Sequence, residues 1–268
     1  MDKIGVVVTG ASGKMGQEVV KAIQSDPLLE LVGAVDSVYA DGFTGEPTQV
    51  ALASIPVAST LEGLLTRCAP QVLVDFTNAE GAMTYLPAAL KRGIACVTGS
   101  TGLSEADVCQ IEHLCSSNQV GAIVASNFAL GAILMIHLSK LASRFFDYAE
   151  IIEMHHEQKV DAPSGTALAT ARAMVQARSQ SFMRNQTTKT TLDGTRGGEW
   201  DGVTIHSVRL PGLVASQEVI FGSLGQTLTV RHDTISRESF MPGVLLAIRE
   251  VTKLKGIVHG LDALLGLG

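Results

Sequence analysis

Short apolar runs alternate with helix-like segments through the first half of the chain, and polar or glycine-rich turns separate them. Runs of this length that are rich in Val, Ile, Leu and Ala are typical of buried β-strands. The strands predicted in this way are Ile4 to Thr9, Leu31 to Asp36, Val72 to Phe76, Ala95 to Thr98 and Ala122 to Ala125. Because strands that alternate with helices are joined by crossovers, the pattern predicts an α/β fold with a doubly wound parallel sheet.

The helices between these strands are marked by their termini. One follows a glycine turn that ends at Gly16 and runs to about Ile23. Another runs from about Glu80 to Arg92 and stops at a glycine, which is the usual residue just after a helix. A third begins after Ser104, where Asp107 at the third helical position predicts a capping box.

The second half of the chain has a different pattern of predicted elements, with longer strand-like runs and one Ala-rich helix from Thr166 to about Arg178. A polar stretch from Ser179 to Gly202 is predicted to be a long surface loop. The four strands predicted here are Tyr148 to His155, Val203 to Leu210, Val214 to Phe221 and Gln226 to His232. Turns separate the last three, so we predict a second, α+β domain built on a mainly antiparallel or mixed four-stranded sheet.

The predicted domain boundaries follow from this change in the pattern of elements. Ser236 begins a closing helix, from Met241 to Lys253, that we expect to pack back on the first domain. The prediction is a first domain of residues 1–127 plus 237–268 and a second domain of residues 128–236.

The composition suits a globular chain and narrows the classes of partner. Of the 268 residues, 46% are hydrophobic and 17% charged, which supports a sizeable core. The formal net charge is −6 and no basic run occurs, so we expect no nucleic-acid partner. No apolar run reaches membrane-spanning length and the N-terminus lacks a secretory pattern, so we expect a cytoplasmic protein without a membrane partner.

Cysteine spacing argues against a metal site. Cys68, Cys96, Cys109 and Cys115 form no CxxC pair, and no histidine lies at the spacing of a zinc ligand. We expect reduced core thiols and no metal.

The turn after the first strand, Gly10-Ala11-Ser12-Gly13-Lys14-Met15-Gly16, has the chemistry of a dinucleotide site. Glycines permit a tight turn and let backbone N–H groups approach a pyrophosphate at a helix N-terminus. The spacing is GxxGxxG instead of the more familiar GxGxxG, and a glycine-rich turn without a ligand is the alternative.

Asp36 strengthens the interpretation as a dinucleotide site. It ends the second strand, 20 residues beyond Gly16, where a carboxylate can bond the adenosine ribose hydroxyls. Ser37 follows Asp36, at a position where an arginine could hold the 2′-phosphate of NADPH, so a serine there favours NADH. Lys14 could reach a phosphate, so NADPH stays an alternative. The sheet is therefore predicted to be of the Rossmann type, with NADH, NADPH or both as the cofactor.

Two later loops follow strand ends on the same predicted edge of the sheet. Gly99-Ser100-Thr101 and Ala125-Ser126-Asn127-Phe128 stand where open α/β sheets bind ligands. Their polar and backbone groups are candidates for orienting a carboxamide, and ordinary turn residues are the alternative.

The segment from Glu153 to Thr166 carries the candidate chemistry. Histidine as a residue type is suited to donating a proton near neutral pH, so His155 and His156 are candidate proton donors, and Lys159 offers a cation for a carboxylate. Ser164-Gly165-Thr166 presents N–H groups and hydroxyls at a helix start, which suits an anion. Solvated histidines beside an ordinary helix cap are the alternative. Together the groups predict an anionic, dicarboxylate substrate that accepts hydride.

From end to end the chain resembles the 4-hydroxy-tetrahydrodipicolinate reductase family, also called dihydrodipicolinate reductase. The turn GASGKMG, the loop GSTG, the segment SNFALG, the run EMHHEQKVDAPSGTA and the later HSVRLPG stand in the family's order. The His-His-x-x-Lys-x-Asp-Ala-Pro-Ser-Gly-Thr run is far more specific than a glycine motif. Two departures are a serine at Ser100, where the family often has threonine, and Asp36-Ser37, where some members have Glu-Arg.

The resemblance implies a role for each matching position. It makes His155 the proton donor or acceptor, Lys159 a second proton donor, and His156, Gly165 and Thr166 substrate-binding residues. The cofactor-binding positions it implies are Gly10, Ala11, Ser12, Gly13, Lys14, Met15, Asp36, Gly99, Ser100, Thr101, Ala125, Ser126, Asn127 and Phe128.

The resemblance also implies a reaction and an assembly. A dehydrated cyclic imine dicarboxylate receives hydride at ring carbon four and a proton at carbon three, giving tetrahydrodipicolinate for lysine and diaminopimelate synthesis. The first domain would bind the dinucleotide, and the second would bind substrate and form a homotetramer through its sheet. The alternative from another class is a dinucleotide-binding redox sensor without turnover, which would leave the His/Lys cluster unexplained.

Overall fold

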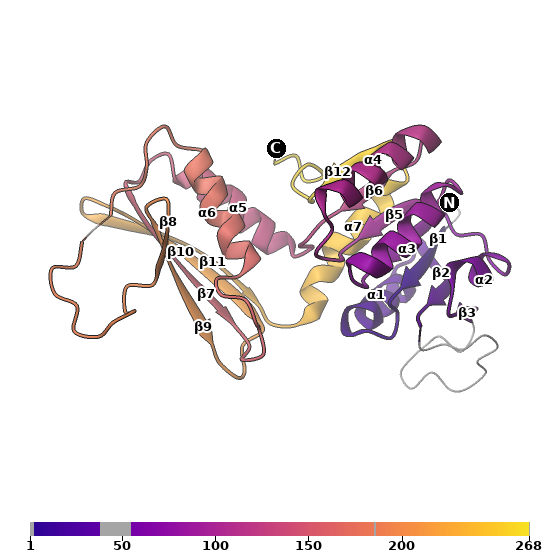
Figure 1. Ribbon diagram of the computed structural model, residues 1–268, viewed down its shortest axis with the longest axis horizontal. Coiled ribbons are helices and arrows are strands. Elements are labelled where there is room, and N and C mark those ends of the chain that lie inside the picture. Colours follow the sequence, from indigo (N-terminus) through magenta and orange to yellow (C-terminus); the bar gives the residue numbers. More distant parts are fainter. Residues whose placement is uncertain (1–2, 38–54, 185, 268) are drawn as a thin grey trace. The chain divides into compact units, whose positions relative to one another are not determined.

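The computed structural model describes residues 3–37, 55–184 and 186–267 (Figure 1). They form two compact units, Met1–Phe128 with Phe240–Gly268, and Ala129–Ser239. The predicted junctions, after residues 127 and 236, lie one residue and three residues before those of the two units.

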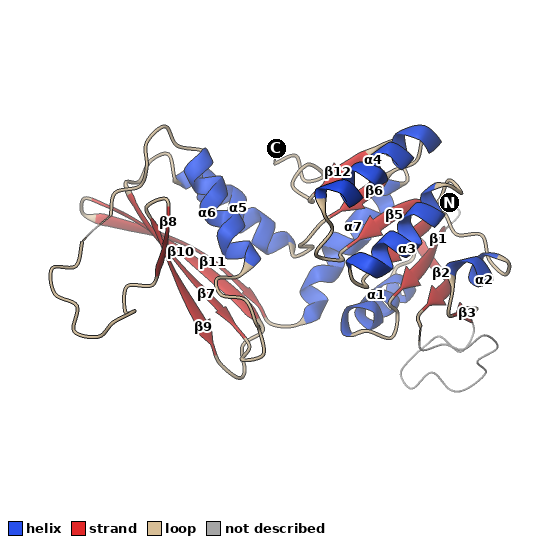
Figure 2. Ribbon diagram, in the orientation of Figure 1, coloured by secondary structure: helices blue, strands red, loops and turns tan. Residues whose placement is uncertain are grey.

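The first unit is built on a seven-stranded sheet in the order β12-β6-β5-β4-β1-β2-β3, and all neighbouring strands in it are parallel (Figures 1 and 2). The strands are β1 (Ile4–Thr9), β2 (Leu29–Val35), β3 (Val57–Ala58), β4 (Val72–Asp75), β5 (Ala95–Thr98), β6 (Ala122–Val124) and β12 (Ile257–His259). This order is that of a Rossmann-type sheet with one further strand at the β6 edge, so the predicted fold class is confirmed.

Helices cover this parallel sheet. They are α1 (Lys14–Ser25), α2 (Leu61–Leu65), α3 (Ala79–Leu90), α4 (Glu105–Asn118) and α7 (Met241–Val251), the last preceded by the 3-10 helix η1 (Arg237–Phe240). Helix α7 packs against α1 and β5, as expected of the closing helix. The predicted capping box is present, because Ser104 Oγ accepts from the Asp107 N–H and the Asp107 carboxylate accepts from the Ser104 N–H.

The connection from β1 determines where this unit can hold a ligand. Strand β1 pairs with β2 on one side and β4 on the other, because the chain first adds β2 and β3 and then returns beside β1. Helices leave the two sides in opposite directions at such a switch point, which opens a crevice at the carboxyl ends of the strands. The wholly buried Val6, Val7 and Val8 anchor β1 beneath it.

The second unit contains a five-stranded mixed sheet in the order β11-β10-β7-β9-β8. Its elements are α5 (Leu130–Ala142), β7 (Tyr148–His155), α6 (Gly165–Gln176), β8 (Gly198–Trp200), β9 (Val203–Arg209), β10 (Ala215–Ser223) and β11 (Gln226–Thr234). The pair β7–β9 is parallel and the other pairs are antiparallel. Helices α5 and α6 contact β11 and β7, and a core that includes Ile151, Met174 and Phe221 fills the space between helices and sheet.

The structure differs from the sequence predictions in the strands of the second sheet, in several short elements and in the burial of the cysteines. The second sheet has five strands and not four, because β8 forms inside the stretch from Ser179 to Gly202 that was expected to be a loop. Helices α2 and α5 and strands β3 and β12 had no predicted counterpart. Cys96 and Cys115 are buried, but Cys68 is half-buried and Cys109 is exposed, so core burial holds for two of the four thiols.

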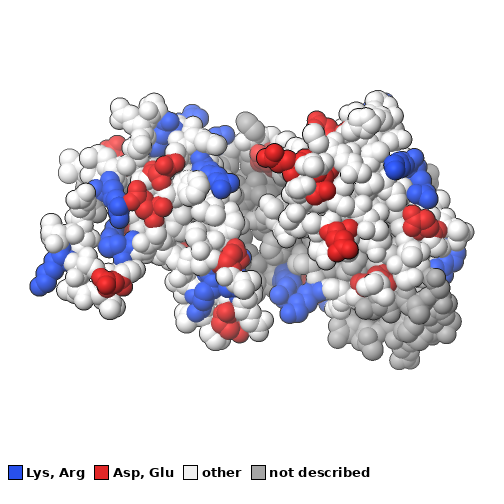
Figure 3. Space-filling view, viewed as in Figure 1, with Lys and Arg blue, Asp and Glu red and all other residues white. Residues whose placement is uncertain are grey.

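The surface of each unit carries charges of both signs. In the view of Figure 3, Lys and Arg side chains are interspersed with Asp and Glu. Within the described part of the chain, no helix combines the length and the apolar character needed to cross a membrane.

Candidate functional site

The glycine turn of the first unit brings backbone N–H groups to the end of β1. Gly10 has φ +74°, and a Cβ there would lie 2.8 Å from the carbonyl oxygen of Phe76, so glycine is required. A Cβ at Gly16 would lie 2.0 Å from the Gly10 carbonyl oxygen, so its absence lets α1 start directly against the turn. Gly13 caps α1 without a side-chain hydrogen bond, and the first turn of α1 has no acidic residue. The turn is therefore suited to a phosphate.

Asp36 follows β2 and reaches across to this turn. Its Oδ2 accepts hydrogen bonds from the Ser12 N–H at 2.9 Å and from Ser12 Oγ at 2.5 Å. The structure thus brings Asp36 and the glycine turn together, as their spacing predicts. Ser37, the next residue, is exposed, and so is Lys14 at the start of α1.

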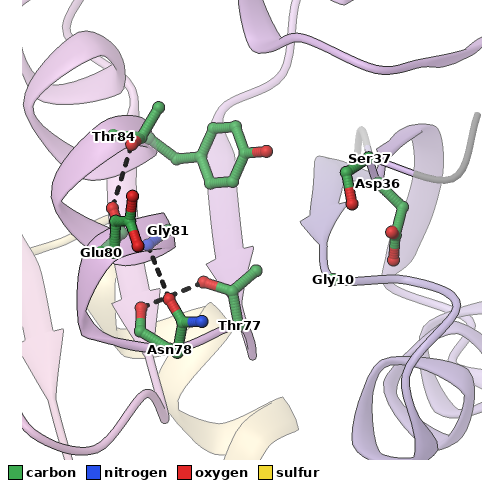
Figure 4. A pocket seen from close by; sticks show the side chains of 9 residues that line it. Gly10, Asp36, Ser37, Thr77, Asn78, Glu80, Gly81 and Thr84 are labelled. Atoms are coloured by element: carbon green, nitrogen blue, oxygen red, sulfur yellow. Dashed lines mark hydrogen bonds between the residues drawn. The ribbon is translucent and has the colours of Figure 1, made fainter.

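A pocket of about 360 Å³ opens beside Asp36 (Figure 4). Asp36, Ser37 and Gly10 form one side, and the loop after β4 with the first turns of α3 forms the other (Figure 4). The residues contributed by this second side are Thr77, Asn78, Glu80, Gly81, Thr84 and Tyr85. Burial, and then the carboxylates of Asp36, Asp75 and Glu62, raise the pKa of Tyr85, so its phenol stays neutral.

Asp75, at the end of β4, is a candidate site residue to which the sequence pattern gives no role. Its side chain is wholly buried and accepts hydrogen bonds from four hydroxyl groups. The donors are Thr9 Oγ1 at 2.8 Å, Thr77 Oγ1 at 2.7 Å, Thr98 Oγ1 at 2.8 Å and Ser100 Oγ at 2.6 Å. One carboxylate therefore ties together the carboxyl ends of β1, β4 and β5.

The predicted loops after β5 and β6 lie at the same edge of the sheet. The Ser100 hydroxyl points inward to Asp75, which leaves backbone groups and the exposed Thr101 to face outward. In the loop after β6, Ala125 and Phe128 are buried, Asn127 is half-buried and Ser126 is exposed. The Phe128 ring packs against Phe76, with ring centroids 5.5 Å apart.

In the second unit, His155 ends strand β7 on the face that α6 covers. Its Nδ1 lies 2.6 Å from Oε2 of Glu153, two residues earlier on the same face, and its side chain is 14% exposed. Burial alone would raise the pKa of Glu153, but hydrogen bonds from His155, Arg209 and Ser207 outweigh burial and lower it to about 2. Glu153 is therefore ionised at neutral pH.

Arg209 at the end of β9 completes this cluster. Its Nη1 and Nη2 donate to the two oxygens of Glu153 at 2.9 and 2.8 Å, and Nη2 also donates to the Asp161 carbonyl oxygen at 2.6 Å. Because β7 and β9 are parallel neighbours, their register sets Arg209 beside His155. The sequence offered a signal for Glu153, since residues i and i+2 of a strand share a face, but none for Arg209.

Lys159 lies in the loop between β7 and α6. Its Nζ donates to Asp161 Oδ1 at 2.7 Å, and its side chain is 22% exposed. This bond and the Lys159 charge lower the pKa of the Asp161 carboxyl. A turn, in which the Lys159 N–H donates to the His156 carbonyl oxygen at 3.2 Å, links Lys159 to the second histidine.

The predicted anion cradle is the N-terminus of α6. The buried Ser164 is its N-cap, and Ser164 Oγ accepts from the Ala167 N–H at 3.2 Å, while its own N–H donates to Glu153 Oε1 at 3.3 Å. Gly165 is exposed, and a Cβ built on it would have no neighbour within 4 Å. Thr166 and His156 are half-buried. Histidine, lysine and helix N-terminus thus belong to one short stretch of this unit.

Comparison with known proteins agrees with these features. Two family models match the chain: “Dihydrodipicolinate reductase, N-terminus” over residues 4–128 and “Dihydrodipicolinate reductase, C-terminus” over residues 131–265. A 4-hydroxy-tetrahydrodipicolinate reductase from Dehalococcoides mccartyi is 50% identical, with 100% of both chains covered. One from Moorella thermoacetica is 47% identical over 98% of each. A solved structure, dipicolinate-bound dihydrodipicolinate reductase from Paenisporosarcina sp. TG-14, is 40% identical, with a TM-score of 0.87 over 97% of this chain and 99% of that one.

Proposed function

This chain belongs to the dihydrodipicolinate reductase family of NAD(P)H-dependent oxidoreductases, and we propose on that premise that it reduces 4-hydroxy-tetrahydrodipicolinate, through its dehydrated cyclic imine, to tetrahydrodipicolinate. The product would serve lysine and diaminopimelate synthesis. The observation that carries the proposal is that His155, Lys159 and the N-terminus of α6 belong to one short stretch, which runs from the last residue of β7 to the start of α6. A relative has dipicolinate bound, and that planar dicarboxylate has the anionic character that such a cluster suits.

The first unit has the features that a dinucleotide needs. The Cβ-free cradle at Gly10 and the uncapped start of α1 fit a pyrophosphate, and the pocket beside Asp36 fits an adenosine ribose. When bound, the nicotinamide ring supplies the hydride. The proposed work of the chain is to hold the dinucleotide with the turn from Gly10 to Met15, with Asp36, and with the loops at residues 99–101 and 125–128.

We propose NADH as the preferred cofactor. The pocket presents two carboxylates, Asp36 and Glu80, and none of its described lining residues is lysine or arginine. A 2′-phosphate would bring about two further negative charges to this place, where like charges repel. Lys14 is the nearest cation along the glycine turn, and it supports some use of NADPH.

In the second unit, His155 is the proposed proton donor. Its ring is only slightly exposed and is held by Glu153, so it is oriented before substrate arrives. Lys159 provides the cation that stabilises charge as the proton moves, and shares in its transfer. His156, Gly165 and Thr166 hold the carboxylates of the substrate through an imidazole, N–H groups and a hydroxyl.

The assembly is proposed to be a homotetramer formed through the sheet of the second unit. One face of that sheet is covered by α5 and α6, and the alternating pattern turns Ile152, Met154, Val208 and Ile220 to the other face. These side chains are half-buried in the isolated chain. An antiparallel-rich sheet with an apolar second face is suited to pair with a copy of itself.

The test follows oxidation of NADH and NADPH with freshly generated substrate. We expect turnover by the wild-type protein, and a kcat lower by on the order of a hundredfold or more in His155→Gln, because a general acid is lost. His113→Gln on the exposed surface of α4 is the matched control and should keep its activity. NADH binding without turnover in the wild type would favour the alternative function, a redox sensor. Full activity of His155→Gln would show that His155 is not the proton donor.

A further inference from the structure

Glu153 is wholly buried, and the proposed reaction gives it no part beyond its contact with His155. A carboxylate that is removed from water must be matched by hydrogen-bond donors or it destabilises the fold. Glu153 has hydrogen-bond partners at both of its carboxylate oxygens. Arg209 donates twice, the Ser164 N–H donates once, and His155 Nδ1 lies 2.6 Å away.

The direction of the His155 bond follows from the chemistry of Glu153. An ionised carboxylate only accepts hydrogen bonds, so the proton between the two groups belongs to Nδ1. In the neutral imidazole a single nitrogen carries hydrogen, and that nitrogen is then Nδ1. Nε2 is left as the nitrogen that can gain and lose a proton.

The charged groups around His155 come from three elements. Glu153 lies on β7 itself, Arg209 lies on β9, and Lys159 and Asp161 form an ion pair in the loop before α6. His156 is the next residue of that loop. Arg209 and His155 both bind the Glu153 carboxylate, so the arginine offsets the charge of the group that orients the imidazole.

We infer that Glu153 is the positioning residue of the proton donor: it holds His155 with Nδ1 protonated, directs Nε2 to the substrate, and is itself held in place by Arg209. The inference rests on the proposed function, since it concerns the same histidine. In the step itself the Nε2–H bond breaks, a C–H bond forms on the substrate, and the electron pair remains on Nε2. The Nδ1 proton stays in place, and a proton taken up from solvent restores the Nε2–H bond.

A matched control stands on the same strand. Glu150, on the opposite face of β7, also binds a histidine and an arginine, with His206 Nε2 at 2.8 Å and Arg196 Nη2 at 2.6 Å. Glu150→Gln therefore removes the same kind of charge cluster from the same strand and leaves His155 untouched.

Two measurements test the inference. Long-range ¹H–¹⁵N spectra of protein labelled at histidine report which ring nitrogen carries the proton, and His155→Gln identifies the signal. We expect the Nδ1–H form of neutral His155 in the wild type and in Glu150→Gln, and loss of that preference in Glu153→Gln. The second measurement is kcat against pH for the same proteins.

In Glu153→Gln the imidazolium faces Arg209 without the carboxylate, which disfavours a positive charge there, so we expect the basic limb of the kcat profile to move to lower pH. We expect kcat to fall by on the order of 10- to 100-fold and KM to change less. Glu153→Asp keeps the charge and should recover part of the loss.

Removing one partner of a buried ion pair can prevent folding, so a charge-neutral variant is needed. Glu153→Gln/Arg209→Met removes both charges, and we expect it to fold and to keep the defects in tautomer and kcat. A wild-type His155 in the Nε2–H form overturns the inference, as does a folded double variant with wild-type kcat and pH profile. If Glu153 controls the tautomer while His155→Gln remains active, the positioning stands and the proposed proton donor fails.

Discussion

Asp75 and Glu153 are both buried carboxylates at strand ends, and they differ in their donors. Asp75 accepts from neutral hydroxyls of three threonines and Ser100, whereas Glu153 accepts from Arg209 and His155. Hydrogen bonds to an ionised group are stronger than neutral ones, so each carboxylate fixes the loops that meet at it. In the first unit those loops are at the proposed dinucleotide site, and in the second they lie at the proposed proton donor.

Asp75→Asn tests whether the hydroxyl cluster supports the dinucleotide site. The amide keeps the shape but loses one acceptor, which frees the Ser100 loop or a neighbouring threonine. A hydrogen bond to a charged group contributes about 1.5–3 kcal/mol, so we expect the Kd for NADH, measured by fluorescence titration, to rise on the order of tenfold. Asp107→Asn in the exposed capping box of α4 is the control and should bind as the wild type does. Equal affinity in all three proteins would show that the loop is held by other contacts.

Glu153 also predicts how stability depends on pH. Its pKa is about 2 in the folded protein against 4.5 for a free side chain. A lowered folded pKa stabilises the protein above the unfolded value, and this contribution is lost as pH falls from about 4.5 towards 2. Chemical unfolding at pH 7 and pH 3 should therefore show a larger loss in the wild type than in Glu153→Gln/Arg209→Met. The other carboxylates are common to both proteins, so parallel losses would contradict the prediction.

At the scale of elements, the end of β2 determines the proposed cofactor preference. Asp36 is held by Ser12, while Ser37 is exposed at the rim of the pocket. Ser37→Arg places a cation there, and a charged hydrogen bond to a 2′-phosphate is worth about 1.5–3 kcal/mol. We expect kcat/KM for NADPH relative to NADH to rise by about tenfold or more. Ser179→Arg, at an exposed position of the second unit, should leave the ratio unchanged. A wild type that already prefers NADPH would contradict the proposal.

The elements that the sequence predicted are those with a clear period and clear ends. Strands β5 and β7 have the predicted bounds, and Ser104 starts α4 as its capping box indicates. Helix α5 escaped prediction because apolar residues occur all around it, so it has no single apolar stripe. Strands β8, β3 and β12 are two or three residues long, and they exist because a neighbouring strand offers an edge.

In the candidate site, too, residues that are close in sequence could be predicted, and pairs that meet only in the folded sheet could not. The glycine turn, Asp36 and the run from His155 to Thr166 are local in sequence, and local spacing was enough to find them. Arg209 is 56 residues from Glu153, and Ser100 is 25 residues from Asp75. Such pairs meet only because strands of one sheet are set side by side in a particular register, and no residue pattern shows that register before the fold is known.

At the scale of the whole molecule, the second unit presents a sheet face that its own helices do not cover. Ile152 and Ile220 lie on it, bordered by the ion pairs Glu150–Arg196 and Glu218–Arg231. An apolar centre with a charged rim is the usual composition of a stable protein interface. This supports the proposed assembly through the sheets, whereas the first unit has both faces of its sheet covered by helices.

Ile220→Glu tests the assembly. Light scattering should give the wild type four times the 28.1 kDa of one chain. A carboxylate at Ile220 would have to be buried without a partner in the interface, so we expect smaller species and a lower thermal stability. Leu28→Glu, an exposed leucine of the first unit, is the control and should remain a tetramer. A monomeric wild type contradicts the proposed assembly, and a tetrameric Ile220→Glu contradicts the assignment of this face. Because Ile220 lies on the face opposite to His155 and Glu153, the dissociated variant would also show whether the proton donor cluster is complete in a single chain.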